Sequence, residues 1–319
     1  ERVLAKENAQ FGLIAIRSAN IFVGPPLTQL SFNGNITGNG GNCRILSAPT
    51  ICSIDCAALS HDERTIAYST STAVKLVDLN TGREMRTLVG QNGRINNVTQ
   101  SNKSIYSWAS VSSDCTITIW DTRQHPANVL TRRLDRSANC LLFSPNDAFI
   151  AIGSDQLYMM DPRIRDMRSL PTSSQVLHVC FHPSYYLLAT GSDDRLVRFW
   201  DIESEECVSK SEPSDGALKK IAFQNDGSLL FTLTDRRCGA ICWEPFEVLG
   251  QCFLTDSNRS LTLTSNDSDV LLLAHSTVTN KISLSSLPIA VFFKELFIIG
   301  TLKYIKLELF NIYILLWLI

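Results

Sequence analysis

The residues of this sequence that could do chemistry are its cysteines, histidines and paired carboxylates, and they match no pattern that a known kind of site needs. Cys52 with Cys56, and Cys238 with Cys242, have a spacing with which a zinc site could begin. Neither pair has a His or Cys partner pair at usable spacing. No glycine-rich loop carries the lysine that holds phosphates, and no Gly-x-Ser-x-Gly turn presents a nucleophile. The acidic pair that begins at Glu205 falls in a predicted loop, where charge is usually solvated. The sequence therefore predicts no catalytic, cofactor-binding or metal-binding residues, and a protein that is not an enzyme.

Composition limits the choice of partners. The chain has 319 residues, a formal net charge of −2 and 45% hydrophobic residues, so a sizeable core is possible. The near-neutral charge argues against a nucleic-acid-binding surface, which needs a net basic face. The ten cysteines are scattered without a Cys-x-x-Cys pair, as expected for reduced, buried thiols in a cytosolic protein. From the residues given, no secretory signal is expected. Because the numbering starts at Glu1, we expect a fragment or an incomplete gene model.

Two stretches of the chain repeat one another. "SSDCTITIWDTRQ" (112–124) matches "SDDRLVRFWDIES" (192–204), and in both an Asp stands six residues before a Trp-Asp pair. Weaker copies also occur. The acidic residues that end the five copies are 43, 40, 40 and 43 residues apart, and they are Asp78, Asp121, Asp161, Asp201 and Glu244. A period of this length indicates a repeat architecture.

Each repeat has the pattern of four short strands. An apolar run ends in Phe143, Phe181 or Phe223, and a turn rich in Pro, Asn, Asp and Gly leads to a second apolar run. The strand that ends in Trp-Asp comes third, and a looser strand such as 82–90 follows. Four strands every 40 to 43 residues are typical of a β-propeller blade.

Two further blades complete the prediction. Residues 3–24 hold two strand-like runs and the start of a third, before a Gly/Asn-rich insertion at 33–42. Residues 261–287 end in phase without a Trp-Asp pair. The sequence thus predicts an all-β fold, a seven-bladed WD-repeat β-propeller over residues 1–287, with an apolar tail over residues 288–319. A β-sandwich with coincidental Trp-Asp pairs is the alternative, and the regular step argues against it.

The motif residues are expected to serve the structure. The Trp should pack between blades and the Asp of the preceding turn should accept hydrogen bonds. The motif residues are Asp114, Trp120, Asp121, Asp194, Trp200, Asp201, Trp243 and Glu244. WD repeats usually also carry a Gly-His pair upstream, whose His links the turn Asp to the Trp in a buried network. The equivalent positions here are Gly90–Gln91, 134–136 and 213–215, and none has the His. We therefore expect a divergent propeller with fewer internal networks and lower stability.

A family resemblance is carried by the run from "ATGSDDRLVRFWDIESEECV" through "DGALKKIAFQNDGSLLFTLTDRRCGAICWEPFEVLGQC". This run resembles the WD-repeat regulatory subunit of katanin, the microtubule-severing complex. The most specific part is "CWEP" (242–245), because that family's sixth blade ends in Trp-Glu-Pro. The following blade, closing in "LLLAHSTVTNKISLSSL", also aligns without a Trp-Asp pair. The resemblance is colinear over residues 3–287.

The resemblance implies a non-catalytic scaffold and targeting subunit. Such a subunit directs an AAA ATPase catalytic subunit to microtubules, centrosomes and spindle poles, in the cytoplasm and cytoskeleton. In that family a C-terminal helical domain binds the catalytic subunit, and nothing in residues 1–319 is expected to correspond to it. We therefore expect this chain to keep only the propeller surface for partners such as tubulin or spindle-pole and centrosomal proteins. No cofactor, nucleic-acid partner or membrane partner is expected.

The two ends of the chain depart from the family. The family has an additional strand before the position of Glu1, which usually closes the ring, and its absence would leave an open sheet edge. The tail has an uncharged run of 11 residues, 309–319, which is short of the ~20 needed to span a bilayer. Read-through of a non-coding segment is favoured over a membrane anchor, and a closing strand is the third interpretation.

Partner-binding residues are expected on the propeller face made by the loops before the first strand and between the second and third strands. The candidates are Arg94, Asp193, Arg195, Arg236 and Arg237. Their excess of arginine suits an acidic partner such as the tails of tubulin, and solvated turn charges are the plain alternative. A WD scaffold of another assembly, such as a ubiquitin-ligase substrate receptor, is the alternative function. An enzyme built on a propeller is a third, which no set of residues supports.

Overall fold

The computed structural model describes residues 55–253 except 63, 79–80, 82, 165, 225, 235–236 and 244–245, and beyond that range the backbone of seven strands. These outer strands are β1 (Leu4–Ala5), β2 (Gly12–Ile16), β3 (Leu30–Ser31), β4 (Cys43–Ser47), β25 (Ser260–Ser265), β26 (Asp269–Ser276) and β27 (Lys281–Pro288). Every regular element of the described residues is a β-strand.

Five four-stranded antiparallel sheets follow one another between residues 57 and 253, and in each the strands pair in chain order. The first two sheets are β5 (Ala57–Leu59), β6 (Thr65–Thr70), β7 (Ala73–Asp78), β8 (Glu84–Val89) and β9 (Ile95–Gln100), β10 (Ser107–Ser112), β11 (Thr116–Asp121), β12 (Asn128–Arg133). The third and fourth are β13 (Cys140–Phe143), β14 (Ile150–Gly153), β15 (Leu157–Asp161), β16 (Asp166–Leu170) and β17 (Val176–Phe181), β18 (Leu187–Ser192), β19 (Val197–Asp201), β20 (Cys207–Lys210). The fifth is β21 (Leu218–Phe223), β22 (Leu229–Thr234), β23 (Arg237–Trp243), β24 (Phe246–Phe253).

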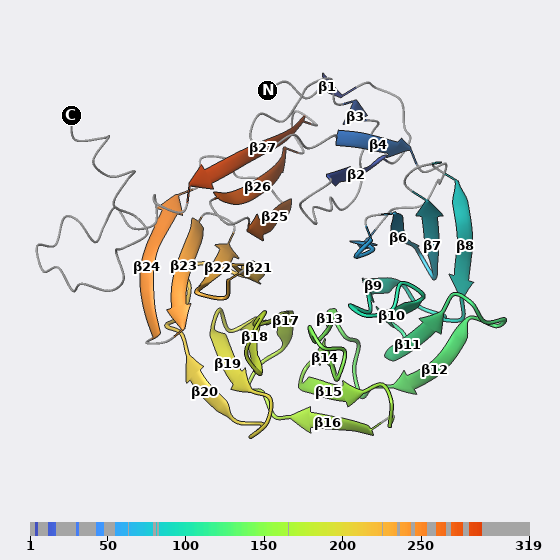
Figure 1. Cartoon of the computed structure of the whole chain (residues 1–319). Coiled ribbons are helices and arrows are strands. Elements are labelled where there is room, and N and C mark those ends of the chain that lie inside the picture. Colours follow the sequence, from blue (N-terminus) through green and yellow to red (C-terminus); the bar gives the residue numbers. More distant parts are fainter. Residues whose placement is uncertain are drawn as a thin grey trace, which may run out of the picture.

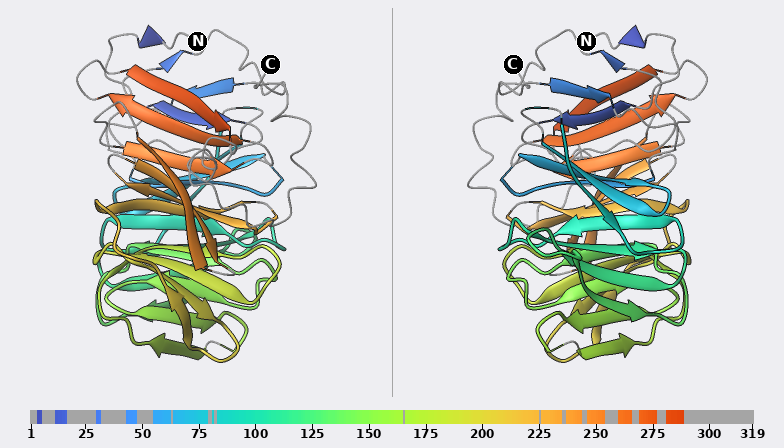
Figure 2. Two further views of the ribbon diagram at one scale, coloured as in Figure 1. Left: turned by 90° about the vertical axis from the view of Figure 1, so that its left-hand side faces the viewer. Right: turned by 90° about the vertical axis from the view of Figure 1, so that its right-hand side faces the viewer.

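The sheets are arranged as blades around a ring, with the first strand of each blade nearest the centre (Figure 1). Seen edge-on, the strands run from one end of the ring to the other (Figure 2). The β2–β4 sheet and the three-stranded β25–β26–β27 sheet lie between the first and fifth of the four-stranded blades and bring the ring to seven. The prediction of an all-β, seven-bladed WD-repeat propeller is therefore confirmed.

The N-terminal blade differs from the sequence prediction. We expected its strands within residues 3–24, ahead of the Gly/Asn-rich insertion. Instead β2 pairs with β4, in a register that sets Gly12 opposite Ser47. The insertion at 33–42 therefore lies between two paired strands of one sheet, because antiparallel strands can be joined by a connection of any length. At the other end β27 reaches Pro288, and the tail that follows lies outside the described residues.

The same bulge recurs where the third strand pairs with the fourth. The register shifts between Ile119 and Trp120 in β11 and between Phe199 and Trp200 in β19. A bulge bends the strand and changes the direction of the next side chain. The shift thus lies directly before the tryptophan, which is the second-last residue of each of these two strands.

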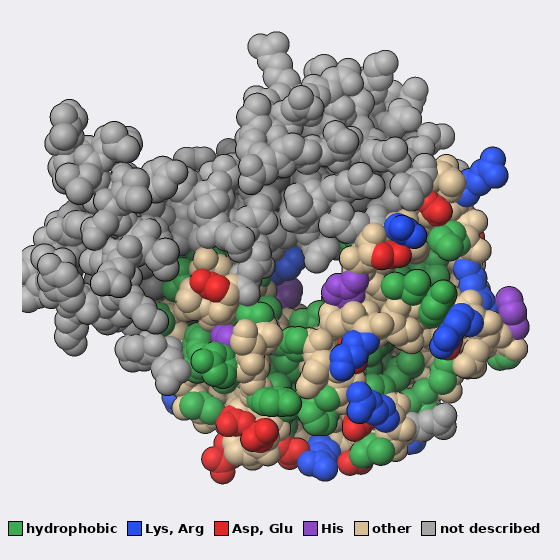
Figure 3. All heavy atoms as spheres, in the orientation of Figure 1, with side chains coloured by type: hydrophobic (Ala, Val, Ile, Leu, Met, Phe, Trp, Pro, Cys, Tyr) green, Lys and Arg blue, Asp and Glu red, His purple; other side chains and the backbone are tan. Residues whose placement is uncertain are grey.

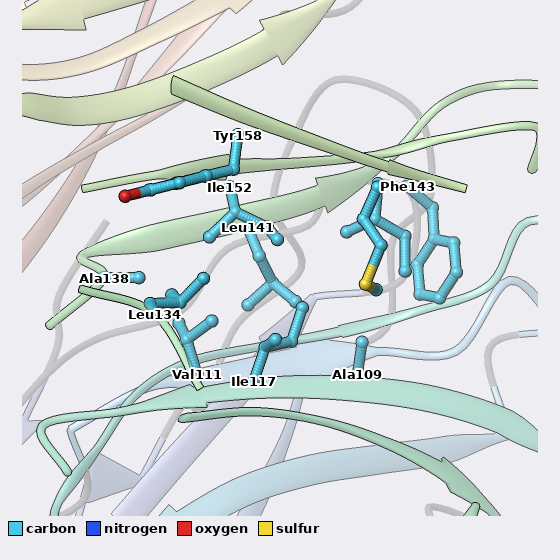
Figure 4. Close-up of a cluster of buried hydrophobic side chains, with 11 residues drawn as sticks. Ala109, Val111, Ile117, Leu134, Ala138, Leu141, Phe143, Ile152 and Tyr158 are labelled. Carbon is cyan, nitrogen blue, oxygen red and sulfur yellow. The ribbon is translucent and has the colours of Figure 1, made fainter. Parts of the chain in front are cut away.

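Apolar side chains of neighbouring blades fill the space between them. One such cluster joins Ala109, Val111 and Ile117 of one blade to Leu141 and Ile152 of the next (Figure 4). Every member is at most 5% exposed, and full burial of a large apolar side chain stabilises a fold by roughly 1.5–3 kcal/mol. A blade covers its apolar faces only by packing on its neighbours, so the ring holds together as a unit.

The two Trp-Asp tryptophans lie in these interfaces. Trp120 is 1% exposed and packs with Val74 and Leu88 of the preceding blade. Trp200 is 5% exposed and packs with Ala151 and Leu157 of its own preceding blade. Each tryptophan therefore joins its blade to the one before it.

Replacing Trp200 with Ala should destabilise the protein by about 3–5 kcal/mol, because the indole leaves a cavity between two blades. Urea denaturation followed by circular dichroism measures this. Ile164→Ala, in an exposed turn, is the control and should change the free energy of unfolding by less than about 0.5 kcal/mol. Equal midpoints for the two variants would contradict the assignment of Trp200 to the blade interface.

Candidate functional site

The face predicted to bind partners is one end of the ring, which we call the link face. It consists of the turns between the second and third strands of each blade and of the links between blades. Its described segments include 90–94, 113–115, 134–139, 171–175, 193–196 and 211–217. Two motif aspartates, Asp114 and Asp194, lie in these turns.

Asp114 holds the link before its own blade. One carboxylate oxygen accepts the backbone N–H groups of Asn92 and Gly93 at 2.7 and 3.2 Å, and the other accepts the Thr116 hydroxyl at 2.6 Å. Burial favours the neutral acid, but hydrogen bonds from Thr116 and Asn92 outweigh it and lower the pKa of Asp114. The ionised carboxylate therefore fixes the position of the 90–94 link.

Gln91 corrects one expectation. The absence of His at this position predicted an incomplete network, yet Gln91 is buried and bridges the turn to the tryptophan. Its amide nitrogen donates to the Thr116 hydroxyl at 3.1 Å, and its amide oxygen accepts the Ser110 hydroxyl at 2.6 Å. The Ser110 oxygen in turn accepts the Trp120 indole N–H at 2.8 Å. An amide has both a donor and an acceptor, so Gln can take the place of His here.

Asp194 is held differently. The guanidinium of Arg198, itself buried, donates to Asp194 at 3.2 Å and to the Ser173 hydroxyl at 2.7 Å. Burial raises the pKa of Asp194, and hydrogen bonding to Arg198 more than reverses this and lowers it. The Trp200 indole donates to the Thr190 hydroxyl at 2.9 Å. An ion pair inside the blade thus replaces the His-centred network in this repeat.

Asp121 and Asp201 lie at the opposite end of the ring. Asp121 accepts the backbone N–H and the guanidinium of Arg123, and these hydrogen bonds, led by the guanidinium, lower the pKa of Asp121 to about 2. Asp201 accepts the N–H groups of Glu203 and Ser204 at 2.8 and 3.2 Å. Both carboxylates therefore accept hydrogen bonds from the turns that follow their strands.

Trp243 of the Trp-Glu-Pro blade is anchored by a neighbour's histidine. The Trp243 indole and the His182 ring both bond the carbonyl of Gly227, at 3.1 and 3.0 Å. Gly227 has φ +79°, and a Cβ at this position would overlap the His182 ring. His182 is buried and joins two blades through this carbonyl. Glu244 lies outside the described residues.

Three of the partner-binding candidates lie together. Asp193 and Arg195 are exposed in the β18–β19 turn. The Arg195 carbonyl accepts the N–H of Ser214 at 2.9 Å, and the next residue of that link, Asp215, forms an ion pair with Arg237. The side chain of Arg195 makes no hydrogen bond or ion pair with the described residues. Arg195 is therefore the cation of this group that is available to bind a partner protein.

The other two candidates lie apart from this group. Arg94 donates from Nε to Asp55 of the preceding blade at 2.6 Å, so a carboxylate already balances its charge. Arg236 lies outside the described residues. The excess of arginine predicted for this face is therefore reduced by internal ion pairs.

The inner strands carry a basic pair, which the sequence analysis did not bring together. His178 of β17 and Lys220 of β21 lie on first strands, and Figure 3 shows histidine and Lys or Arg side chains inside the central opening. Burial, followed by the charges of Lys220 and Lys219, lowers the pKa of His178 to about 4. Burial also lowers the pKa of Lys220. In the sequence, the sign of this pair was the occurrence of Lys219 and Lys220 within an apolar run.

The part of the chain that the structure describes shows no metal-binding cluster, and it holds two thiols in their protonated form. It contains no group of three or more His, Cys, Asp or Glu side chains that could hold a metal ion. Burial raises the pKa of the Cys56 and Cys140 thiols to about 12, so these thiols stay protonated. Among the same residues no helix has the length and apolarity to cross a membrane.

Comparison with known proteins gives matches to WD repeats. The family model "WD domain, G-beta repeat" matches residues 82–121 and 165–201. Eukaryotic translation initiation factor 3 subunit I of Aspergillus fumigatus is 46% identical over 57 residues, which are 18% of this chain and 16% of that protein. Nuclear distribution protein PAC1 of Arthroderma otae is 24% identical over 181 residues, which are 56% of this chain and 35% of that protein.

Among solved structures, a chain of the mitotic checkpoint complex crystal structure aligns with a TM-score of 0.65 and 15% identity. The alignment covers 78% of this chain and 79% of that one. This similarity concerns the fold alone. Together with the repeats and the blades, these matches support a WD-repeat protein.

Gln91→Ala should destabilise the protein by about 1–3 kcal/mol, because it leaves buried polar groups of Ser110 and Thr116 without their partner. Gln124→Ala removes the same side chain from an exposed position and serves as the control. Thermal denaturation of both variants compares the two. A Gln91 variant as stable as the Gln124 variant would rule out the proposed replacement of His.

Acid should weaken the fold through His178. Its pKa falls from the ordinary 6.5 to about 4 on folding, so between these pH values the unfolded chain binds a proton that the folded chain excludes. The free energy of unfolding therefore decreases as pH falls through this window. In His178→Gln this decrease should be smaller by about 1–3 kcal/mol.

Urea denaturation at pH 7 and at pH 4 measures this difference. His125→Gln, at an exposed position, is the matched control and should keep the wild-type pH dependence. If His178→Gln also keeps the wild-type pH dependence, the claim that His178 is buried in its neutral form is wrong.

Proposed function

We propose that this chain is a non-catalytic scaffold that binds partner proteins through the link face. The observation that carries this proposal is the group formed by Asp193 and Arg195, which is exposed and held in place by the neighbouring 214–215 link. The motif acids of the described blades are engaged in internal hydrogen bonds. Chemistry at this face therefore rests on exposed charge, which suits recognition of another protein.

We further propose that the chain acts as a WD-repeat regulatory subunit of katanin. The support is the colinear resemblance to that family, with Trp-Glu-Pro ending at Pro245 and a following blade without Trp-Asp. In this role it directs ATP-dependent microtubule severing to centrosomes and spindle poles. Its partners are the catalytic AAA subunit, tubulin and spindle-pole or centrosomal proteins, and it is located in the cytoplasm and cytoskeleton.

A second candidate is a scaffold in another assembly. The similarity to a translation initiation factor subunit over 57 residues favours this alternative, and a ubiquitin-ligase receptor belongs to the same class. The chain spans 16% of the length of that translation factor subunit and 35% of PAC1. The assemblies of those proteins are therefore proposals for this chain, to be decided by its partners.

Co-precipitation of the tagged 319-residue chain from cell extract, followed by mass spectrometry, tests these proposals. The katanin role predicts recovery of tubulin, spindle-pole proteins or the katanin catalytic subunit. Recovery of initiation factor or ubiquitin-ligase subunits in their place would support the second candidate and contradict the first.

The link face itself is tested by charge reversal. Arg195→Glu should reduce the recovered partner about fivefold or more, the effect of losing an ion pair of about 1 kcal/mol. Arg163→Glu makes the same change at an exposed arginine in the β15–β16 turn, at the opposite end of the ring. Equal recovery by the two variants would exclude the link face as the binding surface.

A further inference from the structure

The end of the ring opposite the link face carries two exposed tyrosines. Tyr185 and Tyr186 lie in the β17–β18 turn and are 63% and 54% exposed. Figure 3 shows this end, where hydrophobic side chains adjoin a group of acidic side chains near the outer edge of the β17–β20 blade. Exposed aromatic rings beside charges are typical of contact sites on proteins.

The turn that carries these tyrosines is held rigidly. The His182 ring nitrogen Nδ1 accepts the N–H groups of Ser184 and Tyr185, both at 3.0 Å. The Tyr185 ring lies 4.9 Å from the His182 ring and 5.6 Å from the Trp243 ring. The backbone of Tyr186 is fixed to the next turn, because its carbonyl accepts the N–H of Ile202 at 3.0 Å. Binding here would cost little ordering of the backbone.

Acids without an ion-pair partner among the described residues lie in the two turns next to the tyrosines. Glu203 and Glu206 are exposed in the β19–β20 turn, and Asp226 is exposed in the β21–β22 turn. Among the described residues none of these three carboxylates has an ion-pair partner, whereas Glu205 pairs with Arg168 at 2.7 Å. We call Tyr185, Tyr186, Glu203 and Glu206 the Tyr–Glu patch. Its net charge is negative.

The blade two positions earlier has a comparable tyrosine that is covered by a cation of the chain itself. Tyr106 occupies the position of Tyr186, since its carbonyl accepts the N–H of Thr122 at 2.9 Å, as that of Tyr186 accepts Ile202. The guanidinium of Arg123 lies 4.9 Å from the centre of the Tyr106 ring. Arg123 and Glu203 both stand two residues after the motif aspartate of their strand. The chain thus supplies its own cation to Tyr106, and an acid in place of that cation beside Tyr186.

We propose that the Tyr–Glu patch binds an arginine-bearing basic segment of a partner protein. The partner's guanidinium takes the position over Tyr186 that Arg123 takes over Tyr106, and Glu203 and Glu206 balance its charge. Ring and carboxylate together favour arginine, whose flat cation stacks on a ring while its N–H groups bond carboxylates. This surface lies at the end of the ring opposite the link face.

Fluorescence polarisation with a labelled peptide of alternating Arg and Ser tests the proposal on the whole chain. The wild type should bind it saturably and should not bind a peptide of alternating Glu and Ser. Glu203→Arg should weaken binding about tenfold, because it removes a carboxylate and places a cation of the chain over Tyr186. Glu212→Arg makes the same charge change at an exposed glutamate of the link face and should leave binding unchanged.

The contribution of the ring is tested separately. Tyr186→Ser should weaken peptide binding about fivefold. Tyr106→Ser removes a ring that Arg123 already covers and should not change peptide binding. Circular dichroism melts check that both variants are folded. Absence of saturable binding, equal effects of the two Arg substitutions, or equal effects of the two Ser substitutions would each overturn the proposal.

Discussion

The structure depends on one hydrogen bond, from the indole N–H of each Trp-Asp tryptophan to a hydroxyl of the neighbouring strand of its own blade. Trp120 donates to Ser110 and Trp200 donates to Thr190. A buried indole without an acceptor would be costly, so this bond fixes which way the ring points. The rest of the indole then fills the space against the preceding blade. The bond thereby helps to decide how these two blades pack on the blades before them.

The polar side chains around these tryptophans differ from blade to blade. Gln91 connects Ser110 to the turn of Asp114, while Arg198 binds Asp194 within its own blade. Trp243 reaches the Gly227 carbonyl and shares it with His182. All three arrangements leave buried polar groups paired, which is the physical requirement. The fold therefore tolerates replacement of the consensus His, and the exposed turns on both ends of the ring are free to carry charges that suit partners.

The sequence was sufficient for features set by local pattern, and insufficient for those set by contacts between blades. The alternation and period around Trp120 and Trp200 predicted β11 and β19 and their repetition. The pairing of β2 with β4 was not predicted, because it joins strands across an insertion. Gln91 was interpreted as a loss, since only the structure shows its amide between two hydroxyls. Arg94 was expected to be available to a partner, but its acid stands 39 residues earlier in the chain and meets it only after two blades pack.

Hydrogen exchange of the tryptophan indole protons tests the central claim most directly. Indole-¹⁵N-labelled protein gives one NMR signal for each tryptophan, and Trp→Phe variants assign them. If the indole bonds hold the blades, the signals of Trp120 and Trp200 should exchange only through opening of the whole ring, and should slow in step with its stability. Exchange of either proton at the rate of an exposed indole, in protein that remains folded, would show that this bond is not what holds the blade.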